Sequence, residues 1–229
     1  MQNRLPKKQK SVANSQLIGP AALVLSAARS LAARQNPLKL LLDGNPGVGK
    51  TDLADQLARE ITRSAHAVEL VNGQSLSVEG VRFWKQNAVY GNLFSAWTVK
   101  RIDEIDHMSG SAIAELLTHL DYLPRHHAII ATTNEFAKLA AQSKGRLESR
   151  FVRFHVAAPS IEETARFLTS KYRISISHAR AIALGAVPDG SLPIEGCNVR
   201  TAINDALGLS AVKNCTFTKS KNGAEVFNP

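Results

Sequence analysis

The chain has 229 residues, enough for one α/β domain with a small satellite or for two small domains. Hydrophobic residues make up 44% of it and charged residues 21%, values that are ordinary for globular proteins and argue against global disorder. Its longest apolar runs are far too short to span a bilayer, and the polar N-terminus lacks the apolar core of a signal peptide. We therefore expect a cytoplasmic protein without a membrane contact. The two cysteines, Cys197 and Cys215, have no metal-binding or redox spacing.

The net charge of +9 is concentrated at the two ends of the chain. The first ten residues carry Arg4, Lys7, Lys8 and Lys10 and no acid, whereas the body of the chain is close to neutral. We expect residues 1–15 to form a flexible basic arm. Such an arm is typical of proteins that contact a polyanion, most simply DNA, but it is equally compatible with a solvated end that aids solubility.

Short apolar runs alternate with amphipathic segments over residues 16–158. Because buried strands that alternate with helices are typical of a parallel sheet, this part predicts an α/β fold with a doubly wound, five-stranded parallel sheet. Residues 159–210 show helical patterns without strands and predict a small α-helical lid domain. Residues 211–229 form either a tail or a hairpin turning at Asn222–Gly223. The strands are expected at residues 38–43, 67–71, 97–102, 128–131 and 152–156, and the helices at residues 21–34, 50–62, 81–86, 111–120, 161–169, 178–184 and 199–207.

A glycine-rich loop follows the first predicted strand and opens a helix. It fits the phosphate-binding pattern G-x-x-x-x-G-K-[ST] at every fixed position. The glycines let backbone N–H groups point at phosphates, and the helix N-terminus adds a partial positive charge. Lys50 would supply a full charge at the β- and γ-phosphates of ATP, and the Thr51 hydroxyl would ligate Mg²⁺. The loop residues are Gly44, Asn45, Pro46, Gly47, Val48, Gly49, Lys50 and Thr51.

Polar residues also follow the third and fourth predicted strands. Asp103 would hold the magnesium ion, and Glu104 would polarise the attacking water, because the carboxyl ends of parallel strands lie beside the phosphate loop. Asn134 follows the fourth strand, from which it could reach that water. An asparagine that simply closes a turn is the alternative for this position.

These segments occur in an order that resembles the AAA+ ATPases, and within them the small subunits of replication clamp loaders (replication factor C type). The resemblance covers roughly residues 15–210. The motifs that carry it are Gly44–Thr51, Ile102–Asp106, Thr132–Asn134, Leu147–Phe151, Leu17–Gly19, Glu69–Asn72 and Gly196–Arg200.

The resemblance implies a role for each of these motifs. Ile18 and Gly19 would pack on the adenine, and Asn72 would act as a switch that holds Glu104 away until subunits assemble. Arg150 would complete the site of a neighbouring subunit, and Arg200 would sense the γ-phosphate from its own chain. Without the other motifs, a surface ion pair for Arg150 and a solvated helix position for Arg200 would be the favoured explanations.

The sequence departs from the family pattern at three places. Lys100 and Arg101 replace two apolar residues in a strand that is normally buried on both faces. Asn45 stands where the family usually has proline. The chain also ends just after the lid motif, without the collar domain of clamp-loader subunits, which puts clamp loading itself in doubt.

We expect from these features a Mg²⁺-dependent ATPase that forms a ring or spiral of identical subunits. It would act on DNA and recruit, load or regulate an unidentified protein of DNA replication, recombination or transposition. Arg82 and Lys85, on a short predicted helix, are candidate DNA contacts, although a solvated helix face is the default explanation for them. Two alternatives stay open: a protein-remodelling motor, whose usual aromatic loop is missing from residues 73–80, and a nucleotide-gated scaffold that does not act on DNA.

Overall fold

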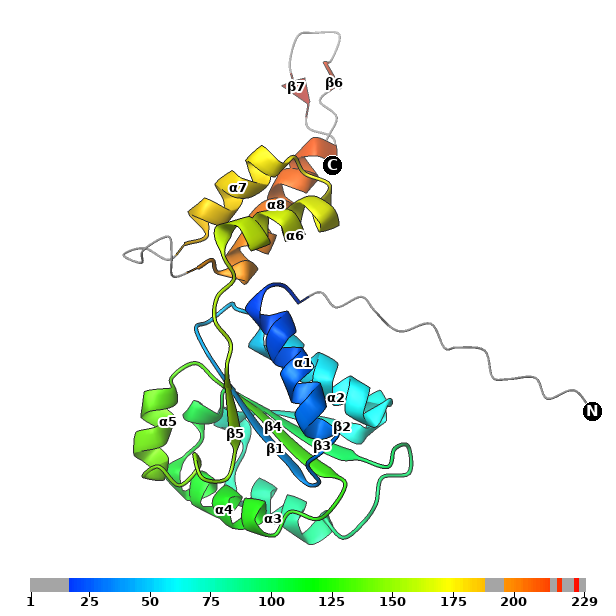
Figure 1. Cartoon of the computed structure of the whole chain (residues 1–229), viewed down its shortest axis with the longest axis vertical. Helices are drawn as coiled ribbons and strands as arrows, with labels where there is room; N and C mark the ends of the chain where they lie inside the picture. The colour runs from blue at the N-terminus through cyan, green and yellow to red at the C-terminus, as the bar shows by residue number, and fades with distance from the viewer. Residues whose placement is uncertain (1–16, 188–195, 215–217, 220–224, 227–229) are drawn as a thin grey trace, which may run out of the picture.

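The computed structural model describes residues 17–187, 196–214, 218–219 and 225–226. The predicted basic arm therefore lies outside the described residues. A five-stranded sheet lies between two layers of helices, and a separate group of three helices follows it along the chain (Figure 1). The elements of the sheet and its two layers are α1 (Pro20–Ala32), β1 (Leu38–Asp43), α2 (Lys50–Thr62), η1 (Ala65–Ala67), β2 (Val68–Asn72), η2 (Gly73–Ser75), α3 (Val78–Asn87), β3 (Thr98–Asp103), η3 (Ile105–His107), α4 (Gly110–Asp121), β4 (His127–Thr133), α5 (Phe136–Ser143) and β5 (Val152–His155).

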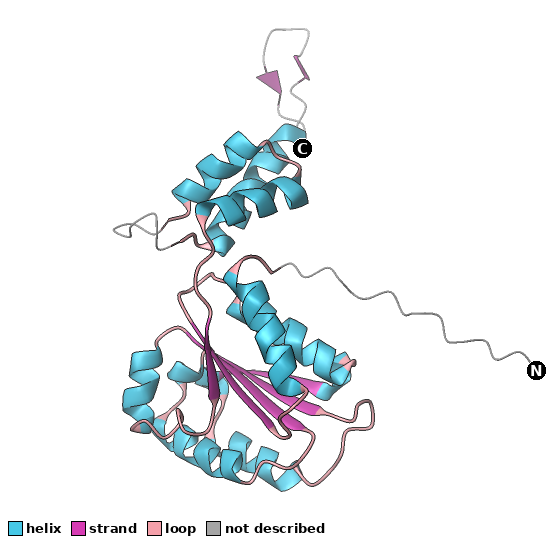
Figure 2. Cartoon of the chain, in the orientation of Figure 1, coloured by secondary structure: helices cyan, strands magenta, loops and turns pink. Residues whose placement is uncertain are grey.

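All five strands run parallel, in the order β2-β3-β4-β1-β5. The central strand β4 is buried at every position, which explains its continuous apolar run. In β1, successive leucines face opposite layers. Leu40 and Leu42 pack with α1 and α2, while Leu41 packs with α3, α4 and α5. Figure 2 shows the helices on both faces of the sheet. The predicted fold class, a doubly wound parallel sheet, is confirmed.

Three helices follow the sheet: α6 (Ile161–Tyr172), α7 (Ile176–Gly185) and α8 (Val199–Asn214). They share an apolar cluster of their own that includes Leu168, Ala179 and Ala206. Helix α6 begins with a capping box in which the Ser160 side chain accepts from the Glu163 backbone N–H and the Glu163 carboxylate accepts from the Ser160 N–H. This packing agrees with the predicted helical lid, although the exact domain limits stay a prediction.

Several elements differ from the expectation. Helix α5 is not predicted from the sequence, although its apolar residues Phe136 and Leu139 have helical spacing. Helix α3 begins earlier, at Val78, because the Ser77 side chain caps it by accepting from the Gly80 N–H. At the C-terminal end, β6 (Thr218–Lys219) and β7 (Glu225–Val226) pair antiparallel, as the hairpin alternative predicts; the turn between them lies outside the described residues.

The segment after β2 packs tightly against the segment after β3. A Cβ atom at Gly73 would lie 2.2 Å from the backbone oxygen of Glu104 and 2.9 Å from its carbonyl carbon. Only glycine lets η2 and η3 approach this closely, so Gly73 fixes the backbone of Glu104 by contact.

We therefore predict that Gly73→Ala lowers the free energy of unfolding by about 1–3 kcal/mol, because the added methyl group must displace backbone. Gly91→Ala is the matched control, since a Cβ atom there meets nothing within 4 Å. Urea denaturation of the two variants measures the difference. Equal midpoints would show that η2 and η3 can separate at no cost.

Candidate functional site

The phosphate loop connects β1 to α2 in a conformation that its glycines make possible. Gly44, Gly47 and Gly49 all have positive φ, at 150°, 80° and 95°. At Gly44 a Cβ atom would also lie 2.3 Å from the Val156 carbonyl oxygen, so a side chain is excluded there twice over. The glycine positions of the sequence pattern thus correspond to real backbone requirements.

Lys50 is buried at the start of α2. Its Nζ donates to the carbonyl oxygens of Gly44 and Asn45, each at 2.8 Å. Burial lowers the pKa of Lys50 to about 8, and the nearby carboxylates of Asp106 and Asp43 oppose part of that shift. The Lys50 ammonium group is therefore already held against the loop when no anion is bound. A bound anion would raise the pKa of Lys50 and so favour its charged form.

One cleft joins the phosphate loop to residues from three other parts of the chain. Glu104, Asn134 and Arg200 line it together with residues of the loop, and their roles there stay predictions. The arginine enters from the start of α8, where the Arg200 N–H donates to the Gly47 carbonyl at 3.4 Å. Its charge is also felt by Lys50, whose pKa it lowers further. The first residues of α8 therefore form one wall of the cleft, next to the phosphate loop.

The Leu17–Gly19 segment lies beside the phosphate loop but is not among the residues that line the cleft. A Cβ atom at Gly49 would have the Leu17 side chain 3.8 Å away as its nearest neighbour. Gly19, with a φ of 52°, lies against the Glu163 carboxylate at the start of α6. The chain at Ile18 therefore runs between the phosphate loop and the start of α6, and the contact of Ile18 and Gly19 with an adenine stays a prediction.

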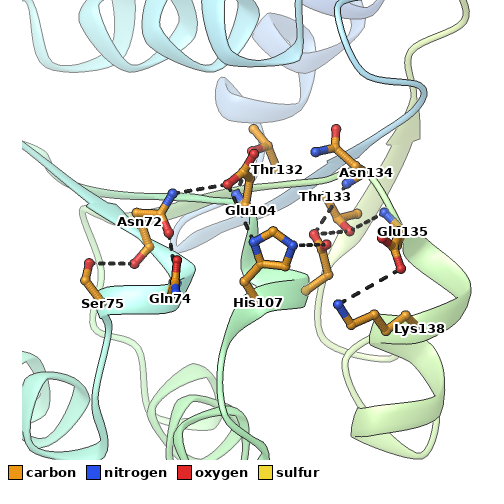
Figure 3. A network of polar contacts seen from close by, with 11 residues as sticks. Asn72, Gln74, Ser75, Glu104, His107, Thr132, Thr133, Asn134, Glu135 and Lys138 are labelled. Carbon is orange, nitrogen blue, oxygen red and sulfur yellow. Dashed lines mark hydrogen bonds and ion pairs between the residues drawn. The ribbon is translucent and has the colours of Figure 1, made fainter.

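Glu104 adopts an unusual backbone conformation at the end of β3. Its φ and ψ are 56° and 53°, in the left-handed region, which costs a non-glycine residue about 1–2 kcal/mol. The Glu104 N–H donates to Thr132 Oγ1 at 3.2 Å, and Asn72 Nδ2 donates to Glu104 Oε2 at 3.2 Å (Figure 3). The structure thus places Asn72 and Glu104 in direct contact, as the predicted switch requires.

The same network continues to β4 through two residues whose roles the sequence analysis does not predict. His107 lies between two carboxylates, with its Nδ1 3.6 Å from Glu104 Oε2 and its Nε2 3.6 Å from Asp106 Oδ2. Thr133 Oγ1 donates to Asp106 Oδ1 at 2.7 Å, and the Asn134 N–H does so at 3.3 Å (Figure 3). Asp106 therefore orients the segment that carries Asn134. In the sequence, only the position of Asp106 within the acidic motif Ile102–Asp106 indicates that it belongs to the site.

The two unexpected charges of β3 have partners on opposite faces of the sheet. Lys100 pairs with Glu69 and lies over the Trp84 ring, 5.3 Å from its centroid. Arg101 is buried and donates to Asp55 Oδ1 at 2.8 Å and to Asp103 Oδ2 at 3.3 Å. Burial raises the pKa of Asp103, and the charge of Arg101 offsets part of the rise. These ion pairs explain how a charged strand fits inside the sheet.

A second buried carboxylate, Asp43, lies next to the loop and has two cationic or polar partners on β5. Arg153 donates to both oxygens of Asp43, at 2.8 and 2.9 Å, and His155 Nδ1 lies 2.9 Å from Asp43 Oδ2. Burial acts to raise the pKa of Asp43, but these hydrogen bonds outweigh it, so the pKa lies below its usual value. The cluster joins the end of β1 to β5 directly before the phosphate loop.

Arg150 is not brought to the cleft of its own chain. It precedes β5, whose Val152 is in register with Leu40 near the start of β1, at the sheet edge opposite the loop. Its guanidinium donates to both oxygens of Asp121, at 2.7 and 2.9 Å. A role in its own site is thus incompatible with this position, while a role in a neighbouring subunit stays a prediction.

Solved structures of other proteins share this fold. A DNA polymerase III gamma subunit-related protein from Thermotoga maritima aligns with a TM-score of 0.53 and 14% identity, over 79% of this chain and 70% of that one. The Holliday junction branch migration motor RuvB from Thermotoga maritima aligns with a TM-score of 0.60 and 21% identity, over 86% of this chain and 64% of that one. The chain thus spans about two thirds of each structure, and at these identities the likeness shows the fold alone.

Comparison with curated proteins gave no match. None of the described helices combines the length and apolar character needed to cross a membrane. The sequence profile of the family described as "ATPase family associated with various cellular activities (AAA)" matches residues 40–154, which run from β1 through the phosphate loop and the acidic motif to β5. The chain therefore belongs to the AAA ATPase family.

Proposed function

We propose that this protein binds ATP with Mg²⁺, hydrolyses it, and assembles with further copies of itself on DNA to recruit, load or regulate a partner protein. The observation that carries the ATPase part is the cleft shared by Lys50, Glu104, Asn134 and Arg200. It combines a cation for phosphate, a carboxylate for water and two polar groups able to contact the γ-phosphate.

The donors around the loop fit a magnesium ion. The Thr51 hydroxyl belongs to a cleft residue, and Asp103 Oδ1 is buried without a hydrogen-bond partner among the described residues. Hard oxygen ligands of this kind are those that Mg²⁺ prefers beside a nucleotide phosphate. Bound there with ATP, the ion would neutralise charge on the phosphates, while Lys50 and Arg200 hold their oxygens.

Glu104 is the proposed general base, and Asn72 restrains it. The hydrogen bond to Asn72 directs the Glu104 carboxylate toward the end of β2 (Figure 3). Hydrolysis requires this carboxylate to face the water beside the γ-phosphate, so the bond must break before turnover. An isolated subunit is then a slow ATPase, and assembly is the event that releases Glu104.

The position of Arg150 supports assembly as a condition for hydrolysis. The cleft contains Arg200 from the same chain, but Arg150 lies at the far edge of the sheet. A second subunit that presents Arg150 to the cleft would add a cation where charge develops in the transition state. A ring or spiral of identical subunits supplies one such arginine to each interface.

The DNA part of the proposal rests on charge and on the fold. The net charge is +9, and the sequence places a basic arm at residues 1–15. Of the two α3 cations, Arg82 pairs with Glu115 at 3.4 Å, while both it and Lys85 are exposed. The scaffold alternative would be a degenerate ATPase, and the unusual charges Lys100 and Arg101 could have indicated one. Both residues have ion-pair partners, so they give that alternative no support.

Complementation between two inactive variants tests the assembly. Lys50→Ala loses the cation at the phosphates, and Arg150→Ala loses the cation offered to a neighbour, so each alone should be nearly inactive. In a mixed assembly some interfaces pair an intact cleft with an intact arginine, and such arginines are worth about 10³–10⁵ in rate. We expect ATPase activity to reappear on mixing, highest near equal proportions. If the two variants co-assemble but the mixture stays inactive, Arg150 does not act in the cleft of the neighbouring subunit. Arg146 would then be the next candidate for that role.

Asn72→Ala should raise the ATPase rate of the unassembled chain. The lost hydrogen bond is worth about 1 kcal/mol, which corresponds to a rate increase of about fivefold. Glu104→Gln should retain ATP binding but hydrolyse it very slowly, and the double variant should be equally slow. An unchanged rate in Asn72→Ala would mean that the contact does not restrain Glu104.

Binding to DNA should weaken steeply as salt rises and show little sequence preference, because phosphate contacts release counterions. Replacing Arg4, Lys7, Lys8 and Lys10 by glutamine should reduce the slope of log affinity against log salt by up to about 3–4. Fluorescence anisotropy with labelled duplex and single-stranded oligonucleotides, in the presence of ATP, measures both slopes. Absence of any salt-sensitive binding would favour the protein-remodelling alternative.

A further inference from the structure

Arg101 is the most deeply buried cation of β3, and it contacts the carboxylate beside the catalytic glutamate. Its side chain is 7% exposed. We propose that Arg101 is a positioning residue that holds Asp103 in the orientation required by the magnesium ion of a bound nucleotide. This inference rests on the proposed function, because it assigns a role to a residue outside the nucleotide contacts.

The geometry divides the two oxygens of Asp103 between two tasks. Arg101 Nη2 donates to Oδ2 at 3.3 Å. The other oxygen, Oδ1, is buried and lacks a hydrogen bond of regular geometry among the described residues, while the Thr132 side chain lies close enough to the carboxylate to offset part of the rise that burial causes in its pKa. A buried carboxylate oxygen without a partner is costly, so it is retained where a ligand satisfies it. Arg101 thus fixes the carboxylate through one oxygen and leaves the other available to the hydrated ion.

Arg101 also joins Asp103 to the helix that carries the second predicted magnesium ligand. Its Nη1 donates to Asp55 Oδ1 at 2.8 Å. The other oxygen of Asp55 pairs with Arg59 at 2.7 Å, one helical turn further along α2. Thr51 lies one turn before Asp55 on the same helix. The bridge from Asp103 through Arg101 to Asp55 therefore sets the distance between Asp103 and Thr51.

Stability alone does not account for this arrangement. A buried cation loses its hydration, and apolar residues of similar volume often replace buried ion pairs without loss of stability. Arg101 Nε is left without a hydrogen-bond partner among the described residues, so the guanidinium is not fully satisfied either. The bridge is thus better explained by the orientation that it imposes on Asp103 than by the energy that it adds to the fold.

A magnesium titration tests the role directly. The fluorescent, non-hydrolysable nucleotide mant-AMPPNP is bound to the full chain, and Mg²⁺ is added from a chelated start while nucleotide binding is followed. Arg101→Met keeps an unbranched side chain that replaces the aliphatic part of the arginine, but it loses both hydrogen bonds. We expect the midpoint of the Mg²⁺ titration to rise about tenfold, the usual effect of removing the partner of a metal ligand. Nucleotide binding in chelator should stay unchanged.

Three further variants make the outcome decisive. Arg101→Lys keeps the charge and one hydrogen bond, so its midpoint should lie between those of the wild type and Arg101→Met. Asp55→Asn weakens the bridge at its other end and should raise the midpoint in the same direction. Lys100→Met is the matched control, because Lys100 lies in the same strand but contacts Glu69 and Trp84 on the opposite face.

Thermal unfolding of each variant separates positioning from a purely structural role. A lower melting temperature with an unchanged or lower Mg²⁺ midpoint would overturn the inference. Should Arg101→Met fail to fold, Arg101→Lys and Asp55→Asn decide the question, and wild-type midpoints in both would overturn it equally. The wild-type titration tests the proposed function itself. If nucleotide binding by the wild type does not depend on the Mg²⁺ concentration, the proposed function is contradicted, whatever the variants show.

Discussion

The parallel pairing of β1 with β4 and of β4 with β3 is the constraint on which the site depends. Parallel strands bring their carboxyl ends to one edge of a sheet. Asp43 at the end of β1 is in register with Thr133 at the end of β4, and Ala131 in β4 with Ile102 in β3. The phosphate loop, the acidic motif and Asn134 all begin within two residues of these positions. Their convergence therefore follows from strand register, and the hydrogen bonds of Thr132, Thr133 and Asn134 with the acidic motif then fix the two segments against each other.

Within this sheet, Glu104, the proposed general base, is held in a restrained conformation. Glu104 has left-handed backbone angles, receives a hydrogen bond from Asn72 and lies against Gly73, where a side chain would not fit. Backbone strain of this kind persists only when surrounding contacts enforce it, and it is concentrated at functional sites. The end of β2 supplies both the polar restraint and the close packing. A movement of β2, an edge strand of the sheet, would therefore change both together.

Local patterns predict the parts of the site that are contiguous in sequence. The loop from Gly44 to Thr51 follows from its fixed spacing, and Asp103 and Glu104 follow from a strand that ends beside it. By contrast, the partners of Lys100 and Arg101 come from α2, α3 and β2, up to 46 residues away along the chain. The Asp43–Arg153 pair spans 110 residues. Such pairs depend on which faces meet after folding, and neither periodicity nor residue type indicates them.

The ion pair between Arg150 and Asp121 bears on whether Arg150 can serve a neighbour. Both residues lie at the surface, and pairs of this kind are worth little because water solvates the separated charges nearly as well. A γ-phosphate in a partly closed cleft offers a denser charge in a less polar surrounding, where hydrogen bonds to ionised groups are stronger. Asp121 therefore restrains the direction of Arg150 in the single chain without competing seriously with a phosphate. The pair orders a long side chain beforehand, which reduces the entropy lost when it enters another site.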